Sequence, residues 1–208
     1  MTLSEFRTDI RRRLGETATV FYSDDDIDDA IDEAYEEMAD ATEFYERQAQ
    51  IQAIAGHTYY NLLNILPDTF LSPRRIYDST TSRWLTPTDP RELDYHGYRQ
   101  WERVSGPPQK YLMRGNWWLG VFPRPATDLP IERLSYTAIP SAMSATTDEP
   151  AFPREYHPGI SEFALSDLFS QARETVKALD KWADYLEYEI ALKSYVEGRA
   201  NLAGAHVL

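Results

Sequence analysis

The densest group of potential metal ligands in the sequence is the acidic run DDDIDD, from Asp24 to Asp29. Carboxylates are the ligands that Ca²⁺ prefers, as in the twelve-residue loop of an EF-hand. Such a loop turns at a glycine in its sixth position and ends with a bidentate glutamate in its twelfth. Counted from Asp24, these positions hold Asp29 and Tyr35, so the calcium motif fails at both. We therefore expect an acidic helix surface rather than a metal site.

The other residues that could carry catalysis form no recognised motif. The sequence contains no G-x-S-x-G, G-x-x-x-x-G-K, G-x-G-x-x-G or H-E-x-x-H pattern. Its four histidines, His57, His96, His157 and His206, lie about 40 to 60 residues apart. His157, in EYHPGI, is expected to cap or pack against the helix that follows. No pair among the 34 Asp and Glu residues stands out as a glycosidase acid and base. We therefore expect no catalytic, metal or cofactor site and no enzyme activity.

Composition excludes several further classes. The 208-residue chain contains no cysteine, which removes disulfides, thiolate metal sites and cysteine nucleophiles, and fits a reducing compartment. No apolar run approaches the roughly 20 residues needed to span a bilayer, and the charged N-terminus is not a signal peptide. A net charge of −13 opposes adhesion to nucleic-acid phosphates. An acidic surface either keeps a chain soluble or forms a wall along which DNA slides without sticking.

Residues 1–48 are expected to form two helices. In the first, Leu3, Phe6, Ile10 and Leu14 recur at spacings of three and four, and Gly15 is the stop signal.

The second helix is expected to begin at the N-cap Ser23, with three aspartates in its first turn, where the helix dipole favours negative charge. No Lys or Arg occurs between Ser23 and Glu46, so its carboxylates repel one another. Such a helix must be held by packing of its apolar side. That side is predicted to consist of Ile27, Ala30, Ile31, Ala34, Met38 and Ala41.

Residues 49–150 are predicted to be rich in β-structure, because apolar residues there alternate and most of the 13 prolines fall there. Two short strands are expected on either side of Gly56, and a pair at 75–78 and 83–86. A short helix is expected within 93–104, bearing Leu93, Tyr98 and Trp101. A further strand at 131–140 would place Ile131, Leu134 and Tyr136 in the core.

Within this segment, GPPQKYLMRGNWWLGVFPRP, residues 106–125, predicts a hairpin that turns at Gly115–Asn116 and stops at Pro123 and Pro125. The strands carry an unusual amount of aromatic surface between backbone breakers. Alternation predicts that one face of the hairpin packs inward while the other is available to a neighbouring molecule.

Residues 151–208 are predicted to form one long helix, from about Gly159 to Val196, followed by an extended tail. Its apolar side chains cover nearly half of the circumference, more than one core contact requires. The second, aromatic stripe therefore packs on the β-rich segment or contacts another subunit. The first stripe comprises Leu165, Leu168, Ala172, Val176, Leu179, Ala183, Leu186 and Ile190, and the second Trp182, Tyr185, Tyr188, Leu192 and Val196.

Several of these motifs occur together, in order, in one known family. The matched pattern is Gly106-x-Pro108-x-x-Tyr111, Gly115, Trp118–Leu119 and Pro123-x-Pro125, then Leu134-x-Tyr136, Pro140, Asp148–Pro150, Pro153, His157 and the long helix. Upstream, YSDDDIDDAIDEAYEEM is similar to the family's second helix. Over residues 20–195 the chain thus resembles the head-to-tail adaptor, or connector, proteins of tailed bacteriophages. The strongly acidic second helix and the double tryptophan Trp117–Trp118 depart from the family pattern.

The resemblance implies a structural virion protein, made in the host cytoplasm and placed at the head–tail interface. It implies an α+β fold: a helical bundle (two N-terminal helices at 1–48 and a long C-terminal helix at 151–208) with a β-rich insertion at 49–150. Family members form a homo-oligomeric ring, typically of twelve copies, beneath the portal protein. The ring extends the DNA channel and presents a docking surface to the tail or next neck protein, so DNA passes through without specific binding. No cofactor or membrane is implied.

Three groups of residues follow as hypotheses for such a ring. The subunit interface would use Tyr111, Trp117, Trp118, Phe122, Trp182, Tyr185, Tyr188 and Leu192. The channel-facing acidic residues would be Asp28, Asp32, Glu36 and Asp40. The portal-contacting tail would include Asn201, Leu202, His206, Val207 and Leu208.

Two other functions remain open at this point. One is a different tail-associated or tail-completion protein, which would also oligomerise but would copurify with tails rather than with portal-bearing heads. The other is a carbohydrate-binding or hydrolysing protein with tryptophan stacking platforms, which predicts a monomer with affinity for glycans.

Overall fold

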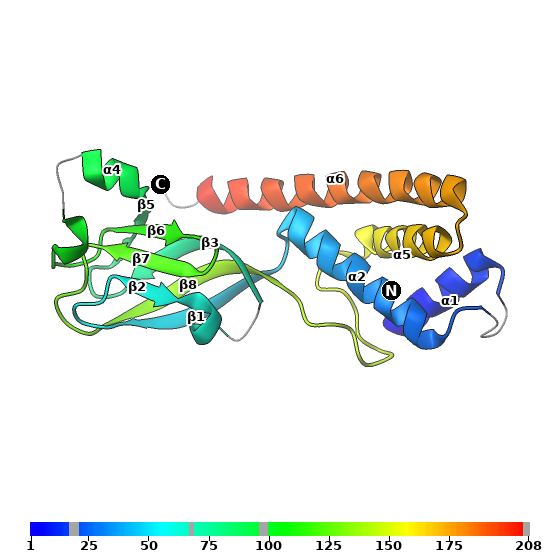
Figure 1. The fold of residues 1–208 in the computed structure, drawn as a ribbon, viewed down its shortest axis with the longest axis horizontal. Coiled ribbons are helices and arrows are strands. Elements are labelled where there is room, and N and C mark those ends of the chain that lie inside the picture. The colour runs from blue at the N-terminus through cyan, green and yellow to red at the C-terminus, as the bar shows by residue number, and fades with distance from the viewer. Residues whose placement is uncertain (17–20, 67–68, 96–99, 206–208) are drawn as a thin grey trace. The chain divides into compact units, whose positions relative to one another are not determined.

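The computed structural model describes residues 1–16, 21–66, 69–95 and 100–205, without the side chains of 129–132 and 200–205. The chain forms two compact units, one comprising Met1–Tyr45 and Ile139–Leu208 and the other Glu46–Ala138. The first unit is helical and the second is built mainly from two four-stranded sheets (Figure 1). This arrangement confirms the predicted α+β class, a helical bundle with a β-rich insertion.

The helical unit begins as the sequence predicts. Thr2 caps the first helix, and Gly15 ends it in the left-handed conformation with φ 76°. Ser23 caps the second helix through a capping box, in which Ser23 Oγ accepts from Asp26 N at 3.1 Å and the Asp26 carboxylate accepts from Ser23 N at 2.8 Å. The helices of this unit are α1 (Leu3–Leu14), α2 (Asp24–Thr42), α5 (Pro158–Gln171) and α6 (Thr175–Ala205), with a 3₁₀ turn at Arg154–Tyr156.

The apolar side of α2 holds the helix in place despite its acidic surface. Ile27, Ala30, Ile31, Ala34 and Met38 are all buried in the core that α2 shares with α1, α5 and α6. Packing on this side therefore outweighs the repulsion among the carboxylates on the other, as expected.

The predicted long C-terminal helix is confirmed as α6, but the prediction that it runs unbroken from about Gly159 is wrong, because the chain turns sharply between α5 and α6. Arg173 adopts the left-handed conformation with φ 62°. Its N–H donates to Ser170 O at 2.9 Å, and the N–H of Glu174 donates to Phe169 O at 2.8 Å. This is a Schellman motif, which usually places glycine where Arg173 stands. Helix α6 then continues to Ala205. The prediction of an extended tail after Val196 is therefore wrong for the residues up to Ala205.

The β unit contains two separate sheets. One has the strand order β1-β8-β3-β4 and the other β2-β7-β6-β5. All described pairs are antiparallel except β5 with β6. The elements are β1 (Glu46–Ala53), β2 (Tyr59–Asn61), α3 (Leu62–Ile65), β3 (Thr69–Asp78), β4 (Arg83–Trp84), β5 (Thr86–Pro87), α4 (Pro90–Tyr95), a 3₁₀ turn (Trp101–Arg103), β6 (Lys110–Arg114), β7 (Trp118–Phe122) and β8 (Leu129–Ile139).

Most predicted strands of this unit are confirmed, although their partners were not foreseeable. The hairpin β6–β7 turns at Gly115, with φ 60°. The strands on either side of Gly56 belong to different sheets, and β1 pairs instead with β8, which lies far along the chain. In β8, Leu134 and Tyr136 are buried as predicted, while the side chain of Ile131 lies outside the described residues. The expected short helix resolves into α4 and the 3₁₀ turn, and Tyr98 also lies outside the described residues.

None of the described helices combines the length and apolar character that a bilayer-spanning segment requires.

Gly159 lies where α5 packs against α2 and α6. A Cβ atom at this position would lie 2.7 Å from Met38 Cε and 2.7 Å from Tyr188 Cβ. The flexible end of Met38 moves readily, whereas Tyr188 Cβ is attached directly to the α6 backbone. The close approach of the helices therefore requires glycine at this position.

We expect Gly159→Ala to lower the free energy of unfolding by about 1–3 kcal/mol, because the cost of overpacking exceeds alanine's gain in helix propensity. The matched control is Gly198→Ala in α6, where nothing lies within 4 Å of the added Cβ. It should raise the free energy of unfolding by up to about 1 kcal/mol. Denaturant unfolding followed by circular dichroism measures both changes. A Gly159→Ala protein as stable as the parent would contradict the packing.

His157 is buried immediately before α5, between aromatic rings. Its ring centroid lies 6.1 Å from that of Phe6 and 5.1 Å from that of Phe152. Nε2–H donates to Phe152 O at 2.9 Å, which leaves Nδ1 to accept from the ammonium of Met1. Of the two expected roles, packing is confirmed and capping is wrong, since the side chain makes no cap hydrogen bond. Burial lowers the pKa of His157, with a further contribution from the Met1 ammonium.

This lowered pKa predicts a pH dependence of stability. In the unfolded chain His157 takes up a proton near pH 6.5, whereas in the fold it stays neutral to a lower pH. The unfolded state therefore binds more protons just below pH 6.5, and the free energy of unfolding falls as the pH drops through that window. His157→Gln removes this component, so urea unfolding between pH 5 and 8 should give a flatter curve for the variant. Parallel curves for the two proteins would show that His157 is not the group responsible.

Candidate functional site

The described residues bring no cluster of metal ligands together. They include no group of three or more His, Asp and Glu side chains placed to hold a metal ion. His57 is exposed and its ring Nδ1 lies 3.3 Å from Ala55 O, while His157 has the structural role given above. His96 and His206 lie outside the described residues. The candidate sites of the described chain are a pocket in the β unit and several exposed surfaces.

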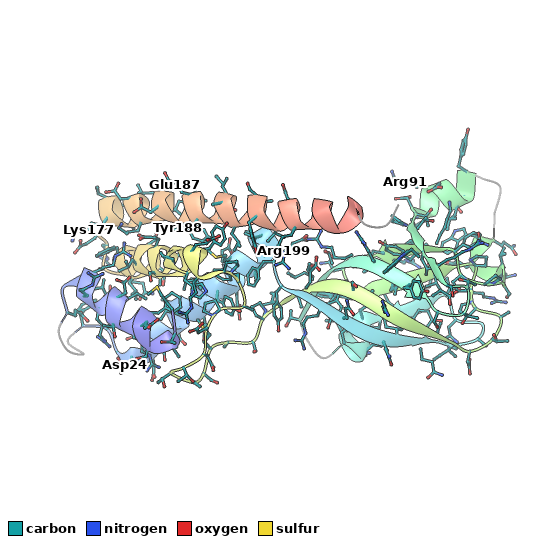
Figure 2. All side chains as sticks on the ribbon, turned by 180° about the vertical axis from the view of Figure 1, so that it is seen from behind. Asp24, Arg91, Lys177, Glu187, Tyr188 and Arg199 are labelled. Carbon is teal, nitrogen blue, oxygen red and sulfur yellow. The ribbon has the colours of Figure 1, made fainter. Side chains whose placement is uncertain are left out.

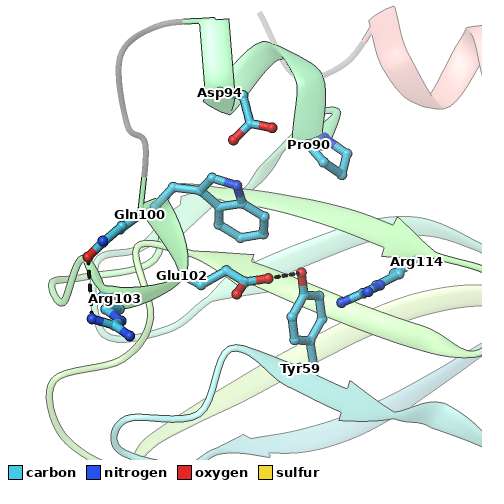
Figure 3. A pocket seen from close by; sticks show the side chains of 8 residues that line it. Tyr59, Pro90, Asp94, Gln100, Glu102, Arg103 and Arg114 are labelled. Atoms are coloured by element: carbon cyan, nitrogen blue, oxygen red, sulfur yellow. Dashed lines mark hydrogen bonds between the residues drawn. The ribbon is translucent and has the colours of Figure 1, made fainter.

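A pocket of about 550 Å³ opens in the β unit beside the 3₁₀ turn at Trp101–Arg103 (Figure 3). Tyr59 Oη donates to Glu102 Oε1 at 2.8 Å, and the Arg114 guanidinium lies 5.5 Å from the centroid of the Tyr59 ring. Burial and the nearby Glu102 raise the pKa of Tyr59. Trp101 is itself buried, so the pocket lacks an open tryptophan face on which a sugar ring would stack.

The hairpin β6–β7 is more deeply buried than its sequence predicts. Tyr111 on β6 and Phe122 on β7 pack inside the unit, and Trp117 is half-buried. Trp118 is 45% exposed and is the main aromatic side chain that the hairpin presents to its surroundings. It adjoins a small hollow that it lines with Tyr59 and Arg114. Of the free aromatic face expected for the hairpin, Trp118 alone is largely exposed in the described structure.

The two stripes of the C-terminal helix are oriented opposite to expectation. The aromatic stripe faces the core: Tyr185 and Leu192 are fully buried, while Trp182 is 39% exposed and Tyr188 half-buried. Figure 2 shows Tyr188 directed toward α5 and Glu187 directed away from it. The surplus apolar surface lies on the other stripe of α6.

This outward stripe consists of Val176, Leu179, Ala183, Leu186 and Ile190, at alternating spacings of three and four. All five side chains are exposed, with Val176 at 75%, Leu179 at 63% and Ile190 at 64%. Such spacing places them in one row along the helix. We call this row the α6 stripe. It is an apolar row that the helical unit leaves exposed in the described chain.

The acidic residues of α2 fall into two groups: some are bound by other residues of the helical unit, and others are exposed. Asp28 accepts from Arg7 Nε at 2.6 Å, and Asp32 accepts from Met143 N at 3.0 Å. Burial raises the pKa of Asp32. Glu36 and Asp40, by contrast, are exposed and have no cation partner among the described side chains.

Two further exposed carboxylates, those of Asp29 and Glu33, share the face of Glu36 and Asp40. Spacings of four, three and four align all four in one row, which we call the α2 ridge. The sequence placed Asp28 and Asp32 on this face. It did not reveal that Arg7 and Arg11, from α1, would supply cations to Asp28 and Asp24.

The sequence reasoning missed a basic aromatic face on the sheet β1-β8-β3-β4. Tyr77 on β3 lies directly opposite Trp84 on β4, with ring centroids 5.1 Å apart. The guanidinium of Arg75 lies 5.9 Å from the Trp84 ring centroid, and that of Arg133, on β8, lies 5.9 Å from the Tyr77 centroid. We call these four residues the β3–β4 face. The alternation of Arg75 and Tyr77 in the sequence was the available signal, since side chains two apart share one face of a strand.

Charge is distributed unequally between the two units. The helical unit carries 25 acidic and 10 basic residues, a net charge of −15. The β unit carries 9 acidic and 11 basic residues, a net charge of +2. The whole excess of negative charge therefore belongs to the helical unit.

The C-terminal residues proposed to contact the portal are only partly described. Asn201 and Leu202 belong to α6, although their side chains are not described. His206, Val207 and Leu208 lie outside the described residues.

Comparison with known proteins identifies the family. The family model for the SU10 adaptor protein matches residues 1–205, which is nearly the whole chain. A comparison with curated protein sequences finds no significant match. The family match spans both units and includes the α2 ridge, the β3–β4 face and the α6 stripe. The chain therefore belongs to the SU10 adaptor protein family, a family of bacteriophage structural adaptors.

Proposed function

We propose that this protein is the head-to-tail adaptor of a tailed bacteriophage virion. Copies of the chain assemble into a ring, of about twelve subunits in this family as implied by the resemblance, beneath the portal protein. The ring extends the DNA channel and provides the surface to which the tail or next neck protein attaches. Membership of the SU10 adaptor family supports this proposal directly.

The observation that carries the assembly step is the α6 stripe. A chain that functioned alone would leave Val176, Leu179 and Ile190 in water, although each gains roughly 1.5–3 kcal/mol on full burial. Contact with another subunit buries this row without any change in the fold. The interface residues expected from the sequence then have two roles. Trp118, Trp117, Trp182 and Tyr188 are at least partly accessible to a neighbour, whereas Tyr111, Phe122, Tyr185 and Leu192 support those surfaces from inside.

The acidic surface suits a channel through which DNA moves. Carboxylates facing a duplex repel its phosphates, so the DNA passes without adhering. Within the acidic group proposed from the sequence, Asp28 and Asp32 are already engaged inside the unit. The channel role therefore rests on Glu36 and Asp40, joined by Asp29 and Glu33 in the α2 ridge. The C-terminal residues Asn201, Leu202, His206, Val207 and Leu208 are proposed to contact the portal.

Mass measurement tests the function as a whole. The purified chain is mixed with portal protein or with portal-bearing heads lacking tails, and the complexes are weighed by native mass spectrometry. We expect a ring of the chain bound to the portal. Recovery with purified tails and not with heads would instead indicate a tail-completion protein. A monomer that binds glycans and neither particle would contradict both structural functions.

The channel role of the α2 ridge predicts the effect of neutralising it. The variant Asp29→Asn, Glu33→Gln, Glu36→Gln, Asp40→Asn should assemble normally, since all four side chains are exposed. Genome ejection should slow several-fold, because the wall no longer repels the phosphates. A matched control neutralises Glu155 and Glu197, which are exposed elsewhere in the helical unit. Ejection kinetics from virions carrying each variant measure the effect, and unchanged packaging and ejection in normally assembled particles would rule out the channel role.

A further inference from the structure

The β3–β4 face is an uncovered sheet surface of unusual composition. The opposite side of the same strands is covered, because Ile76 and Asp78 on β3 and Leu134 on β8 are buried. On the uncovered side, Trp84 is 42% exposed, and both Arg75 and Arg133 are exposed. Tryptophan, tyrosine and arginine are the residue types most enriched among those that dominate binding energy at protein interfaces. The face thus has the composition of an interface core, and no described part of the chain covers it.

Among the described side chains, the two arginines of this face have no acidic partner. Neither Arg75 nor Arg133 forms an ion pair with any described side chain. Each guanidinium lies over an aromatic ring, which orders it and leaves its N–H groups at the edge available to a carboxylate. The occupant that complements this face has apolar side chains for the rings and carboxylates for the two arginines.

The outer side of α6 meets both requirements. The apolar part is the α6 stripe, from Val176 to Ile190. Beside the stripe lie Asp180 and Glu187, which are exposed and have no cation partner among the described side chains. They are seven residues apart, so they lie on the same side of the helix, roughly 10 Å from each other. One helix face therefore presents an apolar row with two unpaired carboxylates along its edge.

We propose that the β3–β4 face of one copy binds the outer face of α6 in the next copy. The Leu and Ile side chains of the stripe pack on Trp84 and Tyr77, while Asp180 and Glu187 pair with Arg75 and Arg133. This assignment rests on the proposed function only in that copies of the chain associate. Beyond that, the assignment states which two surfaces meet. A single type of contact then covers both the β3–β4 face and the α6 stripe.

The charges of the chain favour a protein occupant over a nucleic acid. Arginine next to aromatic rings also occurs in sites that bind single-stranded nucleic acid. Here, however, both ring faces in question already carry a guanidinium, and the chain as a whole has a net charge of −13. The helical unit of a neighbour, with its net charge of −15, is attracted to the face rather than repelled by it.

Because the contact joins two different surfaces, it is heterologous: every subunit offers one face forward and the other backward. A contact of this kind extends from copy to copy and forms a closed ring when the rotation between copies divides a full turn. Variants in which the charges of the two surfaces are reversed, separately and together, distinguish this contact from a pairing of two identical surfaces.

The test reverses charge on each surface in turn. One variant carries Arg75→Glu and Arg133→Glu, and a second carries Asp180→Arg and Glu187→Arg. Each alone should raise the dissociation constant between copies at least about tenfold, because like charges then meet. The variant with all four changes should assemble again. An equimolar mixture of the two double variants should also assemble, with the variants in alternation, because each β3–β4 face is complementary only to the α6 face of the other variant.

A matched control reverses Arg91 and Arg103, two exposed arginines of the β unit outside the β3–β4 face, and should assemble as the parent does. Native mass spectrometry of concentrated protein, and of isolated neck particles from virions, reads out the assembly. Failure of the four-fold variant to assemble although it folds, as judged by circular dichroism, would overturn the pairing.

Cross-linking provides a second, independent measurement. The chain has no cysteine, so every product formed by a bis-maleimide between introduced cysteines is assignable. Trp84→Cys combined with Leu186→Cys should give a ladder of covalent oligomers, while neither single variant should give more than traces of dimer. Efficient dimers from Leu186→Cys alone would show that α6 pairs with itself. Absence of the ladder from both concentrated protein and neck particles, or binding of a single-stranded oligonucleotide that is lost with Arg75→Glu and Arg133→Glu, would refute the proposal.

The outcomes separate this inference from the proposed function. If the chain binds portal-bearing heads as a ring but gives no ladder, the function stands and the two surfaces are wrongly paired. If the ladder forms but the chain binds tails instead of heads, the contact stands and the position in the virion is wrong.

Discussion

The turn at Arg173 decides which face of the C-terminal helix is buried, and the surface of the helical unit follows from that choice. By reversing the chain between α5 and α6, the Schellman motif brings Tyr185 and Leu192 into the core with Phe163. The stripe from Val176 to Ile190, which a continuous helix would have aligned with Leu165 and Leu168, is left outside. A non-glycine residue in the left-handed conformation costs about 1–2 kcal/mol, which the buried aromatic contacts of α6 more than offset. The same turn therefore secures the core and creates the surplus apolar row.

The acidic residues of the helical unit also fall into two groups, those engaged near the core and those exposed on the surface. Two carboxylates that approach the core are bound by cations: Glu162 by Arg13 at 2.6 Å and Lys181 at 3.1 Å, and Asp28 by Arg7. A third, Asp32, accepts from the backbone N–H of Met143 instead. A buried carboxylate without such a partner would be strongly destabilising, so these pairs are necessary for packing α1 against α5 and α2. Arg7, Arg13 and Lys181 are used in this way, whereas Arg154 and Lys177 pair with exposed carboxylates. The outer surface of α2 is left without basic residues, because no Lys or Arg occurs between Ser23 and Glu46, while α6 exposes both acidic and basic side chains.

Local signals in the sequence predicted the local structure well. The spacing of Leu3, Phe6 and Ile10, the stop at Gly15 and the cap at Ser23 each depend on residues within one or two helical turns, and all are confirmed. The break at Arg173 was missed because its signal is usually a glycine, and the energy that favours it comes from contacts between α5 and α6 rather than from the turn. The pairing of β1 with β8 and of Arg7 with Asp28 joins residues far apart in the chain, which no periodicity records. The β3–β4 face was missed for a further reason: Arg133 reaches Tyr77 only through the strand order β8-β3-β4.

These considerations explain why interface residues are hard to choose from sequence in a protein of this kind. Aromatic residues attract attention, yet Tyr111, Phe122 and Tyr185 are large enough to be the preferred fillers of their own unit's core. The residues that we propose to contact a neighbour are those that the fold leaves exposed, here an aliphatic row and two arginines over aromatic rings. In a ring built by a heterologous contact, each face of a subunit must complement only the opposite face of the next subunit. Neither face therefore needs an unusual composition of its own. Their relation becomes visible only when the uncovered apolar area and the unpaired charges of the whole chain are considered together.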